Sequence, residues 1–460
     1  MKTHSRLMLL TAALTLLLAL ASPSAEAVRI GENGEGQVLL FPLFSVEASN
    51  ETELTVRNTS DVGKALRIIA KDPLLGRPLL TVNVYLKPLD SWTGRLVQNS
   101  DRALEPRLVS NDESCTFPAI PGDGLAATAR FLGPTFNDRV GDRLQSGFLE
   151  VYEMGQMDST LAGDCDAITR RWESGAWESM QLTALRNDGI TPPAGGLTGL
   201  VAIKSVDSGR SFQLEPVVLD RFTTEALHVH PDWPVRPSLM DVRPAIAEVP
   251  SILRLNSLEI RTLVPQSFSQ TPIHAVDALL MTTGVSAAYY SDEPGLSFST
   301  ILLTMPTRPY HSDRQGYYLR GRERVVAPFQ TGTPRRAPDP TGADVLQGGA
   351  VDSTGRRFEL FQSPGAMECD ATESTVNGIA LTNRLNFSRV CELGEAEIFL
   401  PDGSTRGEVT LQFSGQLVSD EGDVFSGLPV IGYLFQDTVG GSITGANPVF
   451  ARPVQRQTEE

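Results

Sequence analysis

Short motifs of catalysis are missing from this chain of 460 residues. It contains no GxSxG or SxxK motif, no cysteine near a histidine, and no glycine pattern that binds nucleotide phosphates. The stretch GGSITG at 440–445 is rich in glycine but has no base beside it. A serine and a histidine assembled from distant positions would leave no such trace, and that alternative stays open. The sequence therefore predicts no catalytic residue and no cofactor.

Lysine is also scarce. Only five residues are lysine, and acidic residues outnumber basic ones so that the formal net charge is −16 at pH 7. Nucleic acid is not an expected partner, because binding it requires a basic face. Hydrophobic residues nevertheless make up 41% of the chain, which is enough to build cores and excludes wholesale disorder.

Long apolar runs are absent except at the start of the chain. There, two basic residues precede an uncharged stretch at 7–21, and the small residues AEA follow at 25–27. This order predicts a secretory signal peptide over 1–27, cleaved after Ala27. The alternative is a membrane anchor, but a spanning helix needs about 20 apolar residues. We expect export to the periplasm, the outer cell surface or the medium, with no transmembrane segment after signal removal.

Cysteine is rare, with only Cys115, Cys165, Cys369 and Cys391. An even number in an exported chain indicates disulfides, and three pairings are possible. Proximity favours Cys115–Cys165 and Cys369–Cys391, each stabilising the fold by about 3.5 to 4 kcal/mol in the chain-entropy model. The CxxC spacing of structural zinc sites is missing, so we do not expect the cysteines to bind metal.

Short segments with the pattern of β-strands dominate what is present. Apolar and polar residues alternate in TELTVRNTSD at 52–61, and turn residues recur at intervals of roughly 8 to 12 residues. This spacing predicts a mainly β fold, with an immunoglobulin-like β-sandwich domain at 28–110. We expect a mixed β-rich domain with short helices over 111–329 and a C-terminal β-rich domain over 330–460. The Pro- and Gly-rich stretch 330–344 would be a linker or long loop.

Two segments have the pattern of helices. In DCDAITRRWESGAWESM at 164–180, Asp164 or Asp166 is placed to cap a short helix. In TPIHAVDALLMTTGVSAAYY at 271–290, apolar residues recur at helical spacing. Between them, GLVAIKSVDSGRSFQLEPVVLD at 199–220 has the pattern of a hairpin.

The most apolar stretch of the mature chain is FSGLPVIGYLFQDTVGG at 425–441. Both alternating sets of side chains are apolar: Leu428, Val430 and Leu434 in one, and Ile431, Tyr433 and Phe435 in the other. A strand with two apolar faces is buried on both sides. Because the run is short and contains Pro429, it predicts a core strand and not a membrane helix.

Five stretches carry a resemblance to other proteins: GQVLLFPLFSVE, VYLKPLDSWTG, VYEMGQM, TMPTRPYH and GLPVIGY. Together they resemble a set of uncharacterised exported proteins of Gram-negative bacteria. The resemblance spans most of the mature chain. It implies export and one shared architecture, and it implies no activity.

The sharpest cluster of metal-ligand residues is HVHPDW at 228–233. On an extended chain His228, His230 and Asp232 project to one side, and two imidazoles and a carboxylate suit Zn²⁺. The stretch is similar to part of the metallo-β-lactamase motif, but Trp233 stands where that motif has a further histidine. The two prolines at 231 and 234 favour an exposed loop instead. These residues are weak candidates, and we predict no metal site.

Aromatic and acidic residues offer two further hypotheses. A sugar-stacking platform would be built from Trp172, Trp177, Trp233, Tyr289 and Tyr290, although so few aromatics are more often core residues. The segment SDEGD at 419–423 offers oxygens for Ca²⁺ but lacks the spacing of an EF-hand loop.

The sequence is best interpreted as an exported, non-catalytic protein with a structural or binding role at the cell surface or in the periplasm. Its partner would be a protein or a glycan of the envelope. The first alternative is a secreted hydrolase acting on a glycan or ester, and the second is a carbohydrate-binding module.

Overall fold

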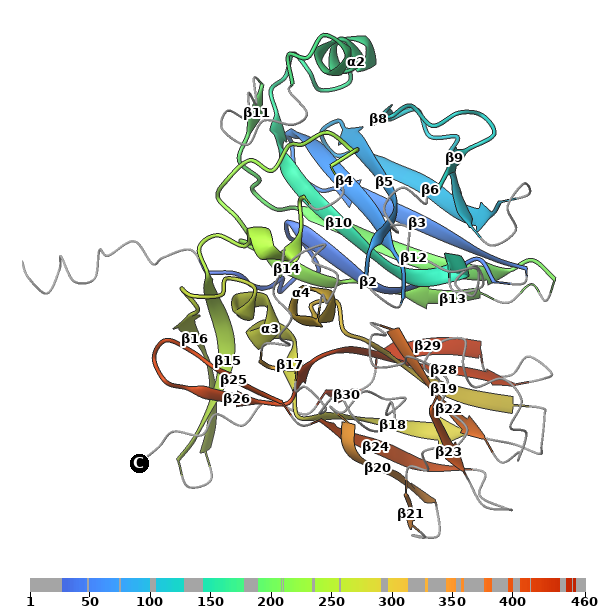
Figure 1. Cartoon of the computed structure of the whole chain (residues 1–460), viewed down its shortest axis with the longest axis vertical. Helices are drawn as coiled ribbons and strands as arrows, with labels where there is room; N and C mark the ends of the chain where they lie inside the picture. Colours follow the sequence, from blue (N-terminus) through green and yellow to red (C-terminus); the bar gives the residue numbers. More distant parts are fainter. Residues whose placement is uncertain are drawn as a thin grey trace, which may run out of the picture.

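A computed structural model describes the chain over residues 27–47, 49–73, 76–99, 105–127, 144–177, 189–207, 209, 211–233, 236–255, 258–290, 297–312, 327–329, 345–352, 357–359, 376–382, 396–399, 406–413, 415–438, 444–448 and 450–451. Most of these residues lie in antiparallel β-sheets, so the predicted mainly β fold is confirmed (Figure 1). No helix in these ranges is long and apolar enough to cross a membrane.

The first sandwich, at the top of Figure 1, is built from two sheets. The larger sheet has the order β1 (Arg29–Ile30), β14 (Val217–Asp220), β2 (Val38–Ser45), β10 (Ser146–Met157), β4 (Gly63–Lys71), β5 (Pro78–Leu86) and β8 (Cys115–Phe117), and β11 (Ile190–Thr191) pairs with β10. The smaller sheet has the order β13 (Ser211–Leu214), β12 (Leu197–Ser205), β3 (Asn50–Asn58), β6 (Ser91–Gln98), β7 (Pro106–Val109) and β9 (Leu125–Ala126). Phe41 of β2 and Trp92 of β6 belong to one apolar cluster, so the core lies between the two sheets.

The second sandwich lies below the first in Figure 1 and has two five-stranded sheets. One sheet has the order β21 (Arg357–Glu359), β20 (Val345–Asp352), β24 (Arg406–Phe413), β18 (Gly284–Tyr290) and β30 (Phe450–Ala451). The other has the order β23 (Ala396–Phe399), β22 (Val376–Thr382), β19 (Ser297–Thr304), β28 (Ile431–Thr438) and β29 (Thr444–Pro448). A separate apolar cluster, which includes Ile301, Val409 and Leu434, fills this sandwich.

Smaller elements lie beside and between the sandwiches (Figure 1). The helices are α2 (Cys165–Glu173), α3 (His274–Leu280), α4 (Arg308–Ser312) and the 3-10 helix η3 (Leu239–Asp241). Three further strand pairs are β15 (Ile246–Leu255) with β16 (Leu258–Ser267), β17 (Met281–Thr282) with β27 (Leu428–Pro429), and β25 (Gln416–Val418) with β26 (Val424–Ser426).

The sheets do not divide where the sequence predicted domain boundaries. β10 inserts between β2 and β4, and β12 pairs with β3, so the segment 28–110 does not close a sandwich alone. Likewise, β18 and β19 pair with strands beyond residue 330. Turn spacing reveals strands but not which distant strands pair. The immunoglobulin-like strand order is not confirmed. That fold has seven to nine strands, whereas the first sandwich has one sheet of eight strands and one of six.

The helix predicted over 271–290 is much shorter than expected. α3 ends at Leu280, and Gly284–Tyr290 forms β18. Alternate residues of β18 are buried, namely Val285, Ala287 and Tyr289. A period of two therefore overrides the helical pattern here, and the adjacent β-branched pair at 282–283 favours the change to strand.

Other local predictions are confirmed. α2 begins after Asp164, whose carboxylate accepts a hydrogen bond from the Ala167 amide at 2.8 Å. The predicted hairpin is the β12–β13 pair, with Lys204 opposite Ser211. The Cys115–Cys165 disulfide is present and ties β8 to α2. The signal residues 1–26, the stretch 330–344 and the predicted Cys369–Cys391 pair lie outside the described residues.

The apolar stretch near the C-terminus is a core strand, as predicted. β28 lies between β19 and β29, and its two faces enter different cores. Leu434 joins the cluster of the second sandwich, whereas Ile431 and Tyr433 join that of the first. The Tyr433 hydroxyl donates to the Glu215 carbonyl oxygen at 2.7 Å. β28 therefore joins the two sandwiches.

Gly427 explains the sharp turn into this strand. Its φ is +113°, a conformation that favours glycine, and a Cβ there would overlap the carbonyl oxygen of Thr282. The next residues form β27, in which Pro429 lies opposite Met281.

Candidate functional site

The HVHPDW stretch lies on the outer face of the larger sheet of the first sandwich. Side chains of β4 and β5 hold its backbone. The Arg67 guanidinium donates to the carbonyl oxygens of His230, Pro231 and Trp233 at 2.9, 2.6 and 2.9 Å. Thr81 and Asn83 donate to the carbonyl oxygens of Pro231 and Val229 at 2.8 and 2.9 Å. Five hydrogen bonds from buried side chains therefore fix this loop, which is not exposed as its prolines suggested.

An aromatic cluster surrounds His228, which is only 2% exposed. The Trp172 indole donates to the Tyr85 hydroxyl oxygen at 2.7 Å, and that hydroxyl lies 3.0 Å from His228 Nε2. The Trp177 ring meets His228 edge to face at 4.5 Å. The tautomer of His228 sets which of these two groups donates. Burial, with a contribution from Arg67, lowers the pKa of His228 to about 3, so the ring is neutral.

The three weak metal candidates do not converge. His228 Nε2 is occupied by Tyr85, and His230 Nδ1 accepts the Asp232 amide at 3.1 Å. The Asp232 side chain is 68% exposed and its carboxylate is 3.8 Å from His230 Nδ1. Burial lowers the pKa of His230, although Asp232 opposes that shift. We interpret this stretch as a packed structural loop.

The aromatic residues of the hypothetical sugar platform are not exposed either. Trp172, Trp177 and Tyr289 are 6%, 2% and 2% exposed, and Trp233 is partly buried against the same core. The side chain of Tyr290 is outside the described part of the structure. The tryptophans pack against histidines and one another, as aromatic residues commonly do in cores.

Acid should destabilise the protein through His228. The folded pKa of about 3 lies below the usual 6.5, so the stabilisation is complete above pH 6.5 and is lost as pH falls towards 3. Urea unfolding at pH 7.5 and pH 4 should show that wild type loses about 3 kcal/mol more than His228→Phe, at 1.36 kcal/mol per pKa unit. An equal loss in both proteins would show that the His228 ring does not titrate in this way.

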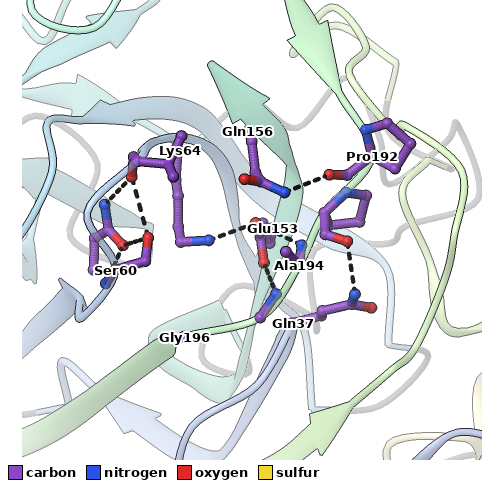
Figure 2. A network of polar contacts seen from close by, with 12 residues as sticks. Gln37, Ser60, Lys64, Glu153, Gln156, Pro192, Ala194 and Gly196 are labelled. Carbon is purple, nitrogen blue, oxygen red and sulfur yellow. Dashed lines mark hydrogen bonds and ion pairs between the residues drawn. The ribbon is translucent and has the colours of Figure 1, made fainter. Parts of the chain in front are cut away.

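A buried ion pair joins β4 and β10 of the same sheet (Figure 2). Lys64 Nζ of β4 is 2.7 Å from Glu153 Oε1 of β10, and the two side chains are 1% and 0% exposed. The Glu153 carboxylate also accepts the amides of Ala194 and Gly195 at 3.1 and 2.7 Å. Burial raises the pKa of Glu153, while Lys64 and these amides oppose the rise. The pair therefore anchors the loop at 192–196 on the sheet.

A second buried network joins the first sandwich to α4. Lys71 Nζ is 2.7 Å from Glu150 Oε2 and donates to the Tyr310 hydroxyl at 2.8 Å. The Tyr152 hydroxyl donates to the same Glu150 oxygen at 2.8 Å. Burial lowers the pKa of Lys71, and Glu150 opposes the shift. Because all four side chains are buried, we interpret this network as a contact that holds α4 against the first sandwich.

The remaining two histidines of the mature chain come together with an aspartate. His274 and Asp277 lie on α3 and His311 lies on α4. One potential ligand atom from each lies within 4.8 Å of the others, the one such group of three in the described part of the chain. His311 Nε2 is 2.8 Å from Asp277 Oδ2, and both side chains are buried. We call these three residues the helix cluster.

His274 sits at the edge of the helix cluster. Its Nε2 is 3.0 Å from the Ala327 carbonyl oxygen, and its ring stacks on that of His311 with centroids 5.6 Å apart. Burial lowers the pKa of His274, which Asp277 opposes. Neither histidine contacts a hydroxyl or thiol among the described residues, so the cluster contains an acid and bases without a nucleophile.

A surface hollow of about 580 Å³ opens onto His274, lined also by Phe268, Ser269, Gln270, Thr271, Val418, Ser419 and Asp420. The SDEGD segment forms the β25–β26 turn beside it. There the Asp420 carboxylate accepts the Ser269 amide at 2.8 Å and the Glu421 carboxylate accepts the Ser267 amide at 2.9 Å. These carboxylates cap the backbone of a neighbouring segment instead of converging on a Ca²⁺ position.

Sequence reasoning missed the helix cluster. His274 and Asp277 have the i, i+3 spacing that places two side chains on one helix face, but His311 is 34 residues beyond Asp277. The one available signal was that histidine is rare, because the chain has five histidines and only four follow the signal region. Scarcity alone could not show that α3 and α4 pack together.

A long β-hairpin forms a sheet of its own, although Ala247 and Val249 at its base are buried in the apolar cluster of the first sandwich. β15 and β16 pair at ten positions, from Ile246 opposite Ser267 to Leu255 opposite Leu258, and no third strand joins this sheet in the described ranges. Its base is tied down, because the Val28 amide donates to the Ile246 carbonyl oxygen at 2.8 Å. Further out, Pro250, Thr262 and Leu263 are exposed. The hairpin runs down beside the second sandwich (Figure 1).

No protein-family model and no curated protein matches the chain. The comparisons therefore assign it to no family.

Proposed function

We propose that this is an exported, non-catalytic protein that binds another protein of the cell envelope through the β15–β16 hairpin. The observation that carries the proposal is a two-stranded sheet, ten residues a strand, that pairs with the sheets of neither sandwich among the described residues. Two rigid sandwiches linked by the buried strand β28 would hold this hairpin in a fixed position.

The physics of an isolated hairpin favours a partner. A two-stranded sheet alone is marginally stable in water, and three or more strands are normally required. Its strand edges carry backbone groups that pair readily with an added strand. Pro250 and Pro265 cannot donate to a ladder and protect the edges of the inner half of the hairpin. The outer segments 251–255 and 258–264 contain no proline and include several apolar residues, so an extended segment of a partner would pair there.

Export is supported by the signal-like start and by the Cys115–Cys165 disulfide, which suits an oxidising compartment. A hydrolase is less well supported, because the described histidines hydrogen-bond to no serine, threonine or cysteine side chain. A carbohydrate-binding module is less well supported too, because the tryptophans at 172 and 177 are buried.

The test is to shorten the hairpin and look for loss of a bound protein. Pro250 lies opposite Leu263, so replacing residues 251–262 with Asn-Gly keeps the register and closes a two-residue turn. Tagged wild-type and shortened chains would be purified from the envelope fraction after mild cross-linking. We expect a defined partner with wild type only.

Circular dichroism should show that the shortened chain still folds, since Ala247 and Val249, the β15 residues in the apolar cluster of the first sandwich, are kept. Recovery of the same partner with both chains would contradict the proposal. Recovery of a second copy of this chain would contradict an envelope partner and would show that the hairpin mediates self-association.

A further inference from the structure

We propose that the helix cluster of His274, Asp277 and His311 binds one divalent transition-metal ion, with Zn²⁺ as the best match. Two imidazoles and one carboxylate are ligands that Zn²⁺ favours, and three protein ligands leave a fourth position open. One potential ligand atom of each residue already lies within 4.8 Å of the others. This inference is independent of the proposed binding function and revises the expectation that the chain has no metal site.

The hydrogen bond of His274 prepares it to be a ligand. A carbonyl oxygen only accepts, so Nε2, at 3.0 Å from the Ala327 oxygen, carries the ring proton. Nδ1 then has a free lone pair. Histidine ligands of metals commonly donate their other N–H to a backbone carbonyl in this way, which fixes the tautomer and the ring orientation.

Asp277 supplies an independent reason to expect a cation. Its side chain is 0% exposed, and Oδ2 is 2.8 Å from His311 Nε2. Its other oxygen, Oδ1, is buried and has no hydrogen-bond partner. A buried carboxylate oxygen without a partner is costly and uncommon in folded proteins. A bound metal ion would satisfy it.

The surroundings of the cluster provide both protection and access. Asp277 and His311 are buried, while His274 is half-buried and also lines the surface hollow of about 580 Å³. An ion could therefore enter from the hollow, and the fourth ligand would be a water molecule on that side. Since Phe268 to Thr271 also line the hollow and directly follow β16, the ion would sit near the base of the hairpin.

Co²⁺ is the sharpest probe, because a tetrahedral site with nitrogen and oxygen ligands gives intense visible absorption bands. Dialysed full-length mature protein would be titrated with Co²⁺ and then with Zn²⁺. We expect one Co²⁺ per chain, visible bands, and displacement of Co²⁺ by one equivalent of Zn²⁺, with elemental analysis confirming the stoichiometry.

Two variants test the ligands. His274→Ala and Asp277→Asn should each weaken binding at least about 10-fold, the effect that loss of even an outer-shell partner has. Asn keeps the shape of Asp277, so that variant should fold even though the site is buried. His230→Ala is the matched control, since this half-buried histidine lies outside the cluster, and it should bind the metal as wild type does.

Two results would overturn the metal site. One is the absence of stoichiometric binding by folded wild type, which circular dichroism would verify. The other is binding that survives both cluster substitutions or is lost equally in His230→Ala. Neither result bears on the hairpin, because the shortened chain keeps all three proposed ligands.

Discussion

Replacing Ile431 with aspartate is expected to unfold the protein at ordinary temperature. Ile431 is 4% exposed and belongs to the core of the first sandwich, although its strand is part of the second. An aspartate there would lose the apolar contacts and bury a charge without a partner. Such a change costs on the order of 4 kcal/mol or more, a large part of the 5–15 kcal/mol that stabilises a typical domain.

Thermal unfolding followed by circular dichroism measures this effect. Val206→Asp is the matched control, because the same kind of change falls on a side chain that is 63% exposed, and it should leave the melting temperature nearly unchanged. Ile431→Val should cost only about 1 kcal/mol. A melting curve of Ile431→Asp that matches wild type would show that β28 does not join the two cores.

Replacing Lys64 with methionine should be the second most damaging change. The Lys64–Glu153 pair is buried on both sides, and removal of one partner leaves the other charge uncompensated. Breaking a buried pair in this way costs about 3 to 5 kcal/mol. The loop at 192–196 should also loosen, since it is held by Glu153 and Gln37. Chemical denaturation gives the free energy of unfolding directly.

The double variant Lys64→Met/Glu153→Gln should recover part of this loss, because no unpaired charge remains and glutamine can still accept an amide. Lys204→Met is the control, since Lys204 pairs with Glu53 at 3.0 Å on the surface, with side chains 48% and 32% exposed. It should cost less than about 1 kcal/mol. Equal costs for Lys64→Met and Lys204→Met would contradict the structural role of the buried pair.

Strands and turns could be predicted from the sequence because they are local. The alternation in 52–61 corresponds to β3, and the two apolar faces of 425–441 correspond to a strand with two cores. The end of α3 could not be predicted, because residues 281–290 fit helix and strand patterns alike and only the pairing of β18 with β24 decides. The same limit applies to domain boundaries, since β10 inserts between β2 and β4 and β12 pairs with β3, all strands far away in the sequence.

The candidate sites show the same difference between local patterns, which a sequence reveals, and contacts between distant segments, which it does not. HVHPDW looked like a metal motif because its spacing is local, but the aromatic residues around His228 come from two distant segments, Tyr85 from β5 and the two tryptophans from α2 and the residues after it. The helix cluster is hidden for the opposite reason, because two of its residues are local and the third arrives with α4. A search for short motifs therefore suggests sites along one segment that do not form, and it misses sites formed when distant segments pack together.

The hairpin also required the structure. Its two strands are recognisable as apolar and β-branched runs, but a sequence does not show that no third strand pairs with them among the described residues. That observation turns a fold description into a proposal about binding, since unpaired edges are where a partner strand adds.

The most direct test of the proposed function is photo-crosslinking in living cells that export the protein. A photoreactive residue would be placed at position 262, exposed on β16, and separately at position 206, exposed at the end of β12 on the first sandwich. We predict one envelope protein joined to the chain from position 262 and none from position 206. Equal crosslinking from both positions, or a partner captured only from position 206, would contradict binding through the hairpin.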